Sequence, residues 1–388
     1  MDDSLKKIIS SGLASLSDAF NSDKAKSEAV GIDIGSSSIK VVQLKKKNGK
    51  AILETYGVIS LGPYANSDVG VVTILKTEDI ARALLDVIKE SNVNTKFAVM
   101  AIPSLSSLIF TISLPSTISE AELSKIIPIE ARKYIPVPIA EVVLDWFVIP
   151  KEAEFFENDQ ATPAQNSSSD PNTTKPKPQT EVLVVAIHND VLSQYQDILK
   201  KTNLRSDSFE MEIFSNIRSS FSHEVAPVLL IDFGASKTKI SIIESGVVRV
   251  FHVVNRGSQD ISRNISQSLS IPFNEAEKLK RTVGLDANMD PRVEEICRLS
   301  INYIFTDINS IVFAYEKKYN KNISKVFLVG GGSLLKGLID VAKTNFKAEV
   351  VYSHPFSKTE APAFLAPILE ASGPEFSVAV GLALRQLI

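Results

Sequence analysis

Hydrophobic and polar positions along the chain follow two periods. Short apolar runs bounded by Gly, Asn and Ser predict strands, beginning with a hairpin sheet between residues 30 and 62. Apolar side chains also recur at helical spacing, so we expect a helix over 77–90 that buries Ile80, Leu84, Leu85 and Ile88. Strands and helices in this mixture predict an α/β fold.

The segment from about 94 to 204 has an order of elements of its own. It predicts two strands, a helix, two further strands and a helix, with the strands at 97–102, 108–114, 142–149 and 182–187. Ser119 and Glu122 form a capping box for the first of these helices. Residues 151–180 are rich in Pro, Ser, Asn, Thr and acids, which predicts a disordered loop.

The stretch Gly31–Val42 predicts a strand, a tight turn and a second strand. Asp33 precedes Gly35, and the turn continues with Ser36, Ser37 and Ser38 before Lys40. Small turn residues let consecutive backbone N–H groups point into one concavity that fits phosphate oxygens. A carboxylate beside phosphate requires a cation between them, and Mg²⁺ held through water suits this role. Taken alone, the pattern is also typical of an ordinary hairpin.

A second copy of this pattern begins at Leu230. Asp232, Gly234 and Lys239 correspond to Asp33, Gly35 and Lys40, and the turn between them contains Ala235, Ser236, Lys237 and Thr238. Two copies far apart in the sequence predict two similar halves, each presenting a phosphate hairpin to a shared cleft. Asp33 and Asp232 would then both face the metal through water.

A glycine-rich loop follows a third apolar strand. Val326–Val329 lead into Gly330, Gly331, Gly332 and Ser333. Glycines at this place allow close approach of a phosphate or of a flat ligand. The Gly-x-Gly-x-x-Gly spacing of dinucleotide-binding proteins and the P-loop pattern are both absent from the sequence.

Composition narrows the class of protein. A length of 388 residues allows two or three domains, and a net charge of −3 gives no bulk electrostatic basis for binding nucleic acid. Cys297 is the single cysteine, which excludes an intramolecular disulfide, and the four histidines lack metal-ligand spacing. We find no bilayer-spanning apolar run and no signal peptide, so we expect a cytoplasmic protein.

The two hairpins and the glycine loop, in this order, resemble the actin-like ATPase superfamily. The resemblance implies two ribonuclease-H-like lobes around a nucleotide cleft that binds ATP with Mg²⁺. Glu277, Lys280 and Arg281 match positions that contact ribose and adenine in heat-shock chaperone ATPases. After the second hairpin, Gly257 stands in an Arg-Gly-Ser sequence where such families tend to have a Gly-Gly pair, and we still expect it to contact nucleotide.

The middle of the chain resembles the PilM family of type IV pilus assembly proteins. The resemblance rests on Leu114-Pro115, Glu130–Pro138 and Val142–Asp145, and Gly31–Val42 and Gly330–Ser333 match as well. It implies a cytoplasmic ATP-binding adaptor that works with other pilus assembly components. It also implies binding of the short N-terminal tail of a PilN-like inner-membrane protein, and through such partners a peripheral place at the inner face of the inner membrane.

Apolar residues at helical spacing predict a flexible or amphipathic leader over residues 1–29, which is longer than the family pattern requires. The resemblance implies that 30–93 is the start of the first lobe and 94–204 an inserted α+β domain of the type found in FtsA and PilM. It implies that 205–388 is the remainder of the first lobe and the second lobe. The partner tail is expected between the insert and the first lobe, and Pro103–Leu108 and Ile135–Ile139 are expected to line its groove.

Hydrolysis of ATP is a separate question from binding. Glu210 stands where the chaperone ATPases carry a catalytic Glu, with Glu212 as the next choice, and either could instead cap the following helix. Two other functions stay open beside the adaptor. One is a filament-forming protein like FtsA, although 378–388 is expected to be a buried final helix. The other is a kinase on the same fold, for which the insert offers no catalytic Asp.

Overall fold

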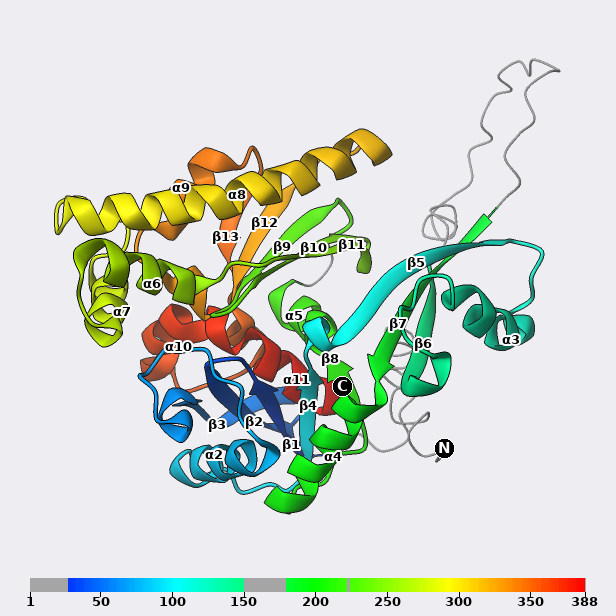
Figure 1. The fold of residues 1–388 in the computed structure, drawn as a ribbon. Coiled ribbons are helices and arrows are strands. Elements are labelled where there is room, and N and C mark those ends of the chain that lie inside the picture. Colours follow the sequence, from blue (N-terminus) through cyan, green and yellow to red (C-terminus); the bar gives the residue numbers. More distant parts are fainter. Residues whose placement is uncertain (1–26, 150–178, 222–223, 388) are drawn as a thin grey trace.

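The computed structural model describes residues 27–149, 179–221 and 224–387, which form two lobes and a smaller unit beside them (Figure 1). The described strands form three sheets, ordered β3-β2-β1-β4-β8, β11-β10-β9-β12-β13 and β5-β7-β6. Most of the expected leader, up to residue 26, lies outside the described residues, and so does nearly all of the expected 151–180 loop.

The first-lobe sheet begins with three antiparallel strands and continues with two parallel ones. Its strands are β1 (Glu28–Ile34), β2 (Ser38–Lys47), β3 (Lys50–Ser60), β4 (Ala98–Ile102) and β8 (Phe209–Met211). Asn48 and Gly49 join β2 to β3 with positive φ angles of 53° and 76°. Two such residues match the right-handed twist of the strands, which is why Asn-Gly makes a tight hairpin there.

The second-lobe sheet repeats this arrangement. Its strands are β9 (Val228–Phe233), β10 (Thr238–Glu244), β11 (Val247–Val254), β12 (Lys325–Val329) and β13 (Glu349–Tyr352). Strands β9, β10 and β11 are antiparallel, and β12 and β13 run parallel to β9, as β4 and β8 do beside β1. The duplicated sequence pattern therefore corresponds to a duplicated sheet.

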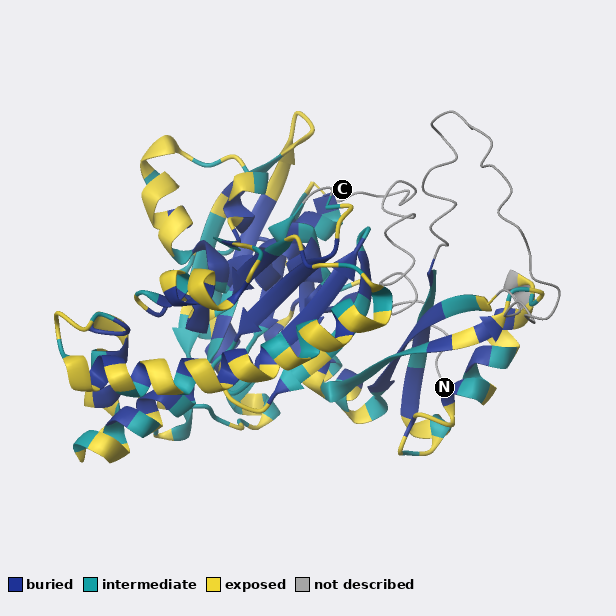
Figure 2. Cartoon of the chain, turned by 90° about the horizontal axis from the view of Figure 1, so that it is seen from above, coloured by how far each residue is buried: buried dark blue, intermediate teal, exposed yellow. Residues whose placement is uncertain are grey.

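Helices cover the sheets, so the strands are mostly buried and the exposed residues lie on the outer sides of the helices (Figure 2). In the first lobe α2 and α4 pack on each other, and α5 and α11 pack together beside β1. The helices are α2 (Thr77–Glu90), α3 (Glu120–Ala131), α4 (Asn189–Thr202), α5 (Glu212–Ser220), α6 (Ser258–Leu269), α7 (Phe273–Thr282), α8 (Pro291–Tyr319), α9 (Leu338–Asn345), α10 (Ala366–Ser372) and α11 (Ser377–Leu387). The expected final helix thus exists, and most of its residues are buried.

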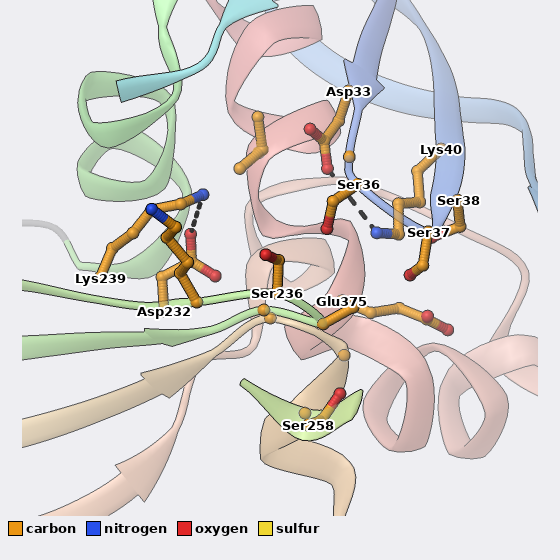
Figure 3. A pocket seen from close by; sticks show the side chains of 18 of the residues that line it. Asp33, Ser36, Ser37, Ser38, Lys40, Asp232, Ser236, Lys239, Ser258 and Glu375 are labelled. Carbon is orange, nitrogen blue, oxygen red and sulfur yellow. Dashed lines mark hydrogen bonds and ion pairs between the residues drawn. The ribbon is translucent and has the colours of Figure 1, made fainter. Parts of the chain in front are cut away.

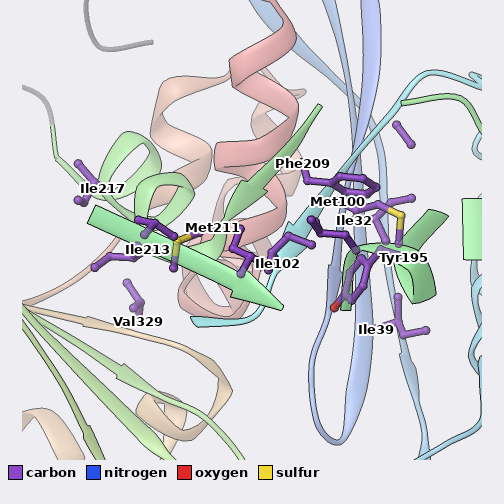
Figure 4. Close-up of a cluster of buried hydrophobic side chains, with 14 of the residues drawn as sticks. Ile32, Ile39, Met100, Ile102, Tyr195, Phe209, Met211, Ile213, Ile217 and Val329 are labelled. Carbon is purple, nitrogen blue, oxygen red and sulfur yellow. The ribbon is translucent and has the colours of Figure 1, made fainter. Parts of the chain in front are cut away.

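One apolar cluster joins the two lobes at their base. Phe209 and Met211 of β8 pack with Ile102 and Ile213, and Val329 at the end of β12 belongs to the same cluster (Figure 4). Burying a side chain of this size contributes about 1.5–3 kcal/mol. The continuous core therefore includes the ends of both β8 and β12, which flank the site described below.

The smaller unit is narrower than the expected 94–204 domain. It consists of β5 (Ser107–Pro115), β6 (Val142–Ile149), β7 (Gln179–His188) and α3, whose capping box at Ser119 is present. Strand β4 pairs with β1, and α4 packs on α2, so both belong to the first lobe. The period of a buried strand does not reveal which sheet it joins, and this produced the difference.

One smaller expectation also changes. Leu85 is 44% exposed, whereas Ala81, Leu84 and Val87 are the residues that α2 buries. In the expected groove segment, Ile135 is buried in the insert's own core, and Val137 and Ile139 are partly buried against it. That Ile135–Ile139 lines a groove stays a prediction.

Candidate functional site

The two hairpin turns have the same backbone geometry. Asp33 pairs with Lys40 across the first hairpin, and Asp232 pairs with Lys239 at the same register in the second. In each turn the glycine N–H donates to the carbonyl three residues on, at 3.0 Å from Gly35 to Ser38 and 3.1 Å from Gly234 to Lys237. The predicted repeat is therefore structural as well as sequential.

Neighbouring segments hold the carbonyl side of each turn. The carbonyls of Ser36 and Ser37 accept hydrogen bonds from the N–H groups of Thr73 and Leu61. In the second hairpin, the N–H groups of Ser258 and Gln259, at the start of α6, donate to the carbonyls of Gly234 and Ala235. The turn carbonyls are thus engaged by protein, and the turns are held in place before any ligand binds.

A cavity of about 550 Å³ lies between the lobes, and both turns line it (Figure 3). It brings together most of the residues that the sequence indicated. These are Asp33, Gly35, Ser36, Ser37, Ser38, Lys40, Asp232, Gly234, Ala235, Ser236, Lys237, Glu277, Lys280, Arg281, Gly330, Gly331 and Gly332.

Three expected residues do not line the cavity. The Thr238 hydroxyl donates to the Arg256 carbonyl at 2.9 Å, and the Ser333 hydroxyl donates to the Gly330 carbonyl at 2.6 Å. Gly257 packs against the second turn, because a Cβ there would lie 2.3 Å from the Ala235 carbonyl oxygen. Thr238 and Gly257 therefore support the second hairpin, and Ser333 supports the glycine loop.

Gly330 is required by packing. Its φ is +83°, and a Cβ would lie 2.5 Å from Asp232 Oδ1 and 2.7 Å from the Phe233 carbonyl oxygen. Only glycine adopts this conformation without strain in so small a space. The glycine loop is consequently fitted to the end of β9, next to Asp232.

The carboxyl of Asp33 has an unusual environment. It is 8% exposed, and Lys40 Nζ lies 3.9 Å from Oδ2. Burial raises the pKa of Asp33 from 3.8 to about 6, with Lys40 opposing the rise and Glu212 adding to it. A cation beside this carboxylate would favour its charged form.

Lys239 is held more tightly than its counterpart. Its Nζ donates to Glu212 Oε2 at 2.7 Å and to Asp232 Oδ2 at 3.2 Å. Burial lowers the pKa of Lys239, but Asp232 and Glu212 together outweigh this and raise it above the ordinary value. The charge of the second lysine is therefore already neutralised by protein carboxylates.

The catalytic prediction for Glu210 disagrees with the structure, because this side chain is buried away from the cavity. Its two oxygens accept from Arg218 at 2.6 and 2.7 Å, and from the Ser215 hydroxyl at 2.6 Å. Although burial opposes it, the two arginines Arg218 and Arg385 hold the pKa of Glu210 below its usual value. Glu210 thus belongs to a buried ion-pair network.

Glu212 lies two residues later and lines the cavity. Its Oε1 accepts from the Ser104 N–H at 2.7 Å, and its Oε2 accepts from Lys239. Strand β8 ends at Met211 and α5 begins at Glu212, so the two glutamates point in different directions. The second choice from the sequence therefore lines the cavity, whereas the first does not.

On the α7 side of the cavity the carboxylate of Glu277 is already engaged. It accepts from the Ser262 hydroxyl at 2.6 Å and from Arg281 Nε at 2.7 Å, and Lys280 Nζ lies 2.7 Å away. Burial favours the neutral form, but Lys280 and the hydrogen bonds outweigh it, so the pKa of Glu277 is lowered. This side of the cavity is thus formed by a charged cluster that is already hydrogen-bonded.

Sequence reasoning missed several lining residues. Lys239 could have been included, because it repeats Lys40. Glu375, Asn216, Ser106 and Gly70 come from segments outside the repeated pattern and reach the cavity only through the fold. Burial raises the pKa of Glu375, which Lys40 and Arg281 partly counteract.

Comparison with known proteins gives two family matches. Residues 31–161 match the model for type IV pilus assembly protein PilM, and residues 229–381 match the model for cell division protein FtsA. A chain of a PilM-PilN type IV pilus biogenesis complex is similar in structure, with a TM-score of 0.76 and 21% identity, over 94% of this chain and 100% of that one.

Residues 31–161 of the chain are thus PilM-like. The fold of the chain is that of the actin-like ATPases, as predicted.

Two further relatives extend this fold assignment. FtsA of Neisseria meningitidis serogroup B (strain ATCC BAA-335 / MC58) is 22% identical over 347 residues, which cover 83% of this chain and 79% of that protein. Ethanolamine utilization protein EutJ of Carboxydothermus hydrogenoformans has a TM-score of 0.52 and 14% identity, with 99% of both chains covered. Among the described residues of this PilM-like chain, no helix is long and apolar enough to cross a membrane.

Proposed function

We propose that this PilM-like protein binds Mg-ATP between its lobes and uses it to regulate a peptide partner in type IV pilus assembly. The main support for this proposal is that two hairpins line one cavity, and that each has an Asp and a Lys in matching register. Turn N–H groups and lysines suit phosphate oxygens, whereas the buried carboxylates suit a hydrated cation.

Each part of the cavity has a role in this proposal. Lys40 and Lys239 would neutralise phosphate charge, and Asp33 and Asp232 would orient water around Mg²⁺. Mg²⁺ itself would supply charge neutralisation between the phosphates and these carboxylates. On the other side, Glu277, Lys280, Arg281 and the glycine loop would receive the nucleoside.

The fit of Mg²⁺ rests on Asp33. A buried carboxyl with a pKa of about 6 is partly neutral near pH 6, and a bound divalent cation would hold it in its charged form. Glycine also suits both turns themselves, since a Cβ would lie 3.0 Å from the Ser38 carbonyl oxygen at Gly35 and 2.9 Å from the Lys237 carbonyl oxygen at Gly234.

If the protein hydrolyses ATP, we assign the positioning of the attacking water to Glu212 in place of Glu210. Glu212 is buried, lines the cavity and is fixed by the Ser104 N–H and by Lys239. These contacts keep its carboxylate oriented, which is what a water-positioning group requires. Slow turnover would fit a protein in which nucleotide serves regulation.

The proposed partner is the cytoplasmic N-terminal tail of a PilN-like inner-membrane protein. The PilM-PilN complex, one chain of which shares this fold, supports this choice. Strands β5 and β6 are the two edges of the insert's three-stranded sheet, and an extended peptide can add to such an edge. Binding to this tail would place the protein at the cytoplasmic face of the inner membrane.

A short segment links the two proposed sites. Pro103, Leu105 and Ser106 line the nucleotide cavity, and the Ser104 N–H binds Glu212. Strand β5 of the insert begins at Ser107, directly after this turn. Nucleotide could thus alter the position of the insert, and by reciprocity the peptide would change nucleotide affinity by the same factor.

Calorimetry with and without Mg²⁺ tests nucleotide binding. Saturation to about 100 times Kd should stabilise the fold by roughly 2.7 kcal/mol. A synthetic tail peptide is then titrated into the protein with and without Mg-ATP. Failure to bind nucleotide refutes the cleft assignment, failure to bind the peptide refutes the adaptor, and equal peptide affinity in both states refutes only the coupling.

The FtsA match supports a second candidate, a filament-forming protein. Sedimentation of the full chain with Mg-ATP, at increasing protein concentration, separates the two. Polymer that pellets in an ATP-dependent manner would favour the filament.

A further inference from the structure

Asn216 is a cavity residue with an unmatched polar atom. It lies on α5 one turn after Glu212, lines the cavity and is 2% exposed. Its Oδ1 has no hydrogen-bond partner among the residues that the structure describes. Leaving a buried amide oxygen unpaired costs free energy, which an aliphatic side chain at this position would avoid.

Other polar side chains of α5 are paired. The Ser215 hydroxyl donates to Glu210 at 2.6 Å, and the Ser219 hydroxyl lies 2.8 Å from the Ser377 hydroxyl. Glu212 uses one oxygen for the Ser104 N–H and the other for Lys239. The unpaired acceptor on this helix thus belongs to a side chain that lines the cavity.

The surroundings indicate which ligand would complete it. Asp33, Asp232 and Glu212 bring carboxylates to the cavity, and Lys239 pairs with two of them. A phosphate oxygen cannot donate to Asn216 Oδ1, but a water molecule can. Mg²⁺ keeps several of its waters in protein sites, and those waters are strong hydrogen-bond donors.

We infer that Asn216 is a positioning residue that accepts a hydrogen bond from a water of the Mg²⁺ hydration shell. The inference rests on the proposed binding of Mg-nucleotide and adds a residue from α5 to the two hairpin carboxylates. Its consequence is that Asn216 supports the magnesium-dependent part of nucleotide affinity and contributes nothing to the fold of the nucleotide-free protein.

The test compares Asn216→Leu, which keeps the size and removes the acceptor, with wild-type protein. Kd for ADP is measured by calorimetry in Mg²⁺ and in EDTA, together with the melting temperature of nucleotide-free protein. We expect Kd in Mg²⁺ to rise about tenfold, Kd in EDTA to stay unchanged, and the melting temperature to stay the same or rise.

Two further variants make the comparison specific. Asn216→Asp keeps an acceptor oxygen and should recover most of the magnesium dependence, even if the added charge lowers the melting temperature. Asn189→Leu is the matched control, because Asn189 Oδ1 is also buried without a described partner but lies outside the cavity lining. It should leave both Kd values unchanged.

The outcomes separate this inference from the proposed function. Wild-type protein that binds no ADP in Mg²⁺ overturns both. Normal magnesium-dependent affinity in Asn216→Leu overturns the inference alone, and so does an equal loss of affinity in Mg²⁺ and EDTA. A lower melting temperature for Asn216→Leu assigns Asn216 a structural role instead. If Asn216→Leu does not fold, Asn216→Asp decides, and a loss of its magnesium-dependent affinity overturns the inference.

Discussion

The two hairpins share a backbone but differ in their electrostatics. Lys40 lies 3.9 Å from Asp33 in the first, whereas Lys239 lies 3.2 Å from Asp232 and also binds Glu212 in the second. The difference comes from α5, which contributes Glu212 to one side of the cleft. A repeated turn therefore becomes two different half-sites, one with a carboxyl that burial keeps partly neutral and one that protein ion pairs already balance.

The largest difference in stability should appear when Glu210 and Glu212 are each replaced by glutamine in separate variants. Glu210→Gln removes the buried carboxylate that Arg218 and Arg385 face, which should cost about 3–5 kcal/mol of stability. Glu212→Gln leaves Lys239 paired with Asp232, so it should cost about 1 kcal/mol and chiefly impair turnover, if there is any. Urea denaturation measures both.

Acid should reduce the Glu210 effect. The fold lowers the pKa of Glu210, so its stabilising contribution is complete above its ordinary pKa of 4.5 and is lost as pH falls through the lower folded-state value. The difference between wild type and Glu210→Gln should shrink below that pH. A constant difference down to low pH would contradict the assigned ion pair.

Replacing Asp33 and Asp232 by asparagine should change the stability of the protein in opposite directions. Because the folded pKa of Asp33 is raised from 3.8 to about 6, its neutral form stabilises the fold below pH 3.8, and this contribution is lost as pH rises through 6. Asp33→Asn should therefore stabilise nucleotide-free protein by roughly 2–3 kcal/mol at pH 7 and by little at pH 4.

Asp232→Asn is the matched variant. It removes one of two carboxylates that hold Lys239, so we expect a loss of about 1–2 kcal/mol at pH 7. Both variants should weaken Mg-dependent nucleotide binding. Thermal melting across this pH range tests the signs, and equal effects of the two substitutions would show that the half-sites are alike.

Replacing the lysines should give a smaller contrast in stability. Lys239→Met leaves Asp232 and Glu212 as buried carboxylates without their cation and should destabilise by about 2 kcal/mol, whereas Lys40→Met removes a longer contact and should cost less than about 1 kcal/mol. Both should weaken ATP binding. Equal losses of stability would mean that the 3.9 Å contact is as strong as the shorter ones.

The smallest difference is expected between the turn glycines. A Cβ would lie 3.0 Å from the Ser38 carbonyl oxygen at Gly35 and 2.9 Å from the Lys237 carbonyl oxygen at Gly234. Gly35→Ala and Gly234→Ala should each lower the free energy of unfolding by about 1 kcal/mol. The two losses should be nearly equal. A large inequality would show that the two turns are not equivalent even in their backbone.

Short-range sequence patterns predicted much of the fold. The Asp-x-Gly turns, the strand periods and their repetition predicted two similar halves, and the actin-like fold is confirmed. The helix over 77–90 and the capping box at Ser119 also follow from short-range rules. These features depend on interactions between residues close in sequence, so their pattern is visible in one chain.

Contacts between distant segments had to come from the tertiary structure. No local rule tells that 98–102 joins β1, or that the change from strand to helix at Met211 turns Glu210 into the core and Glu212 toward the cleft. Asn216 and Glu375 enter the cavity because α5 packs on α11 and because the segment before α11 packs against β2, β12 and the glycine loop. The sequence alone determined the two turns and their repetition. Packing decided which charges surround each turn, because electrostatic environment depends on every element nearby and not on the turn itself.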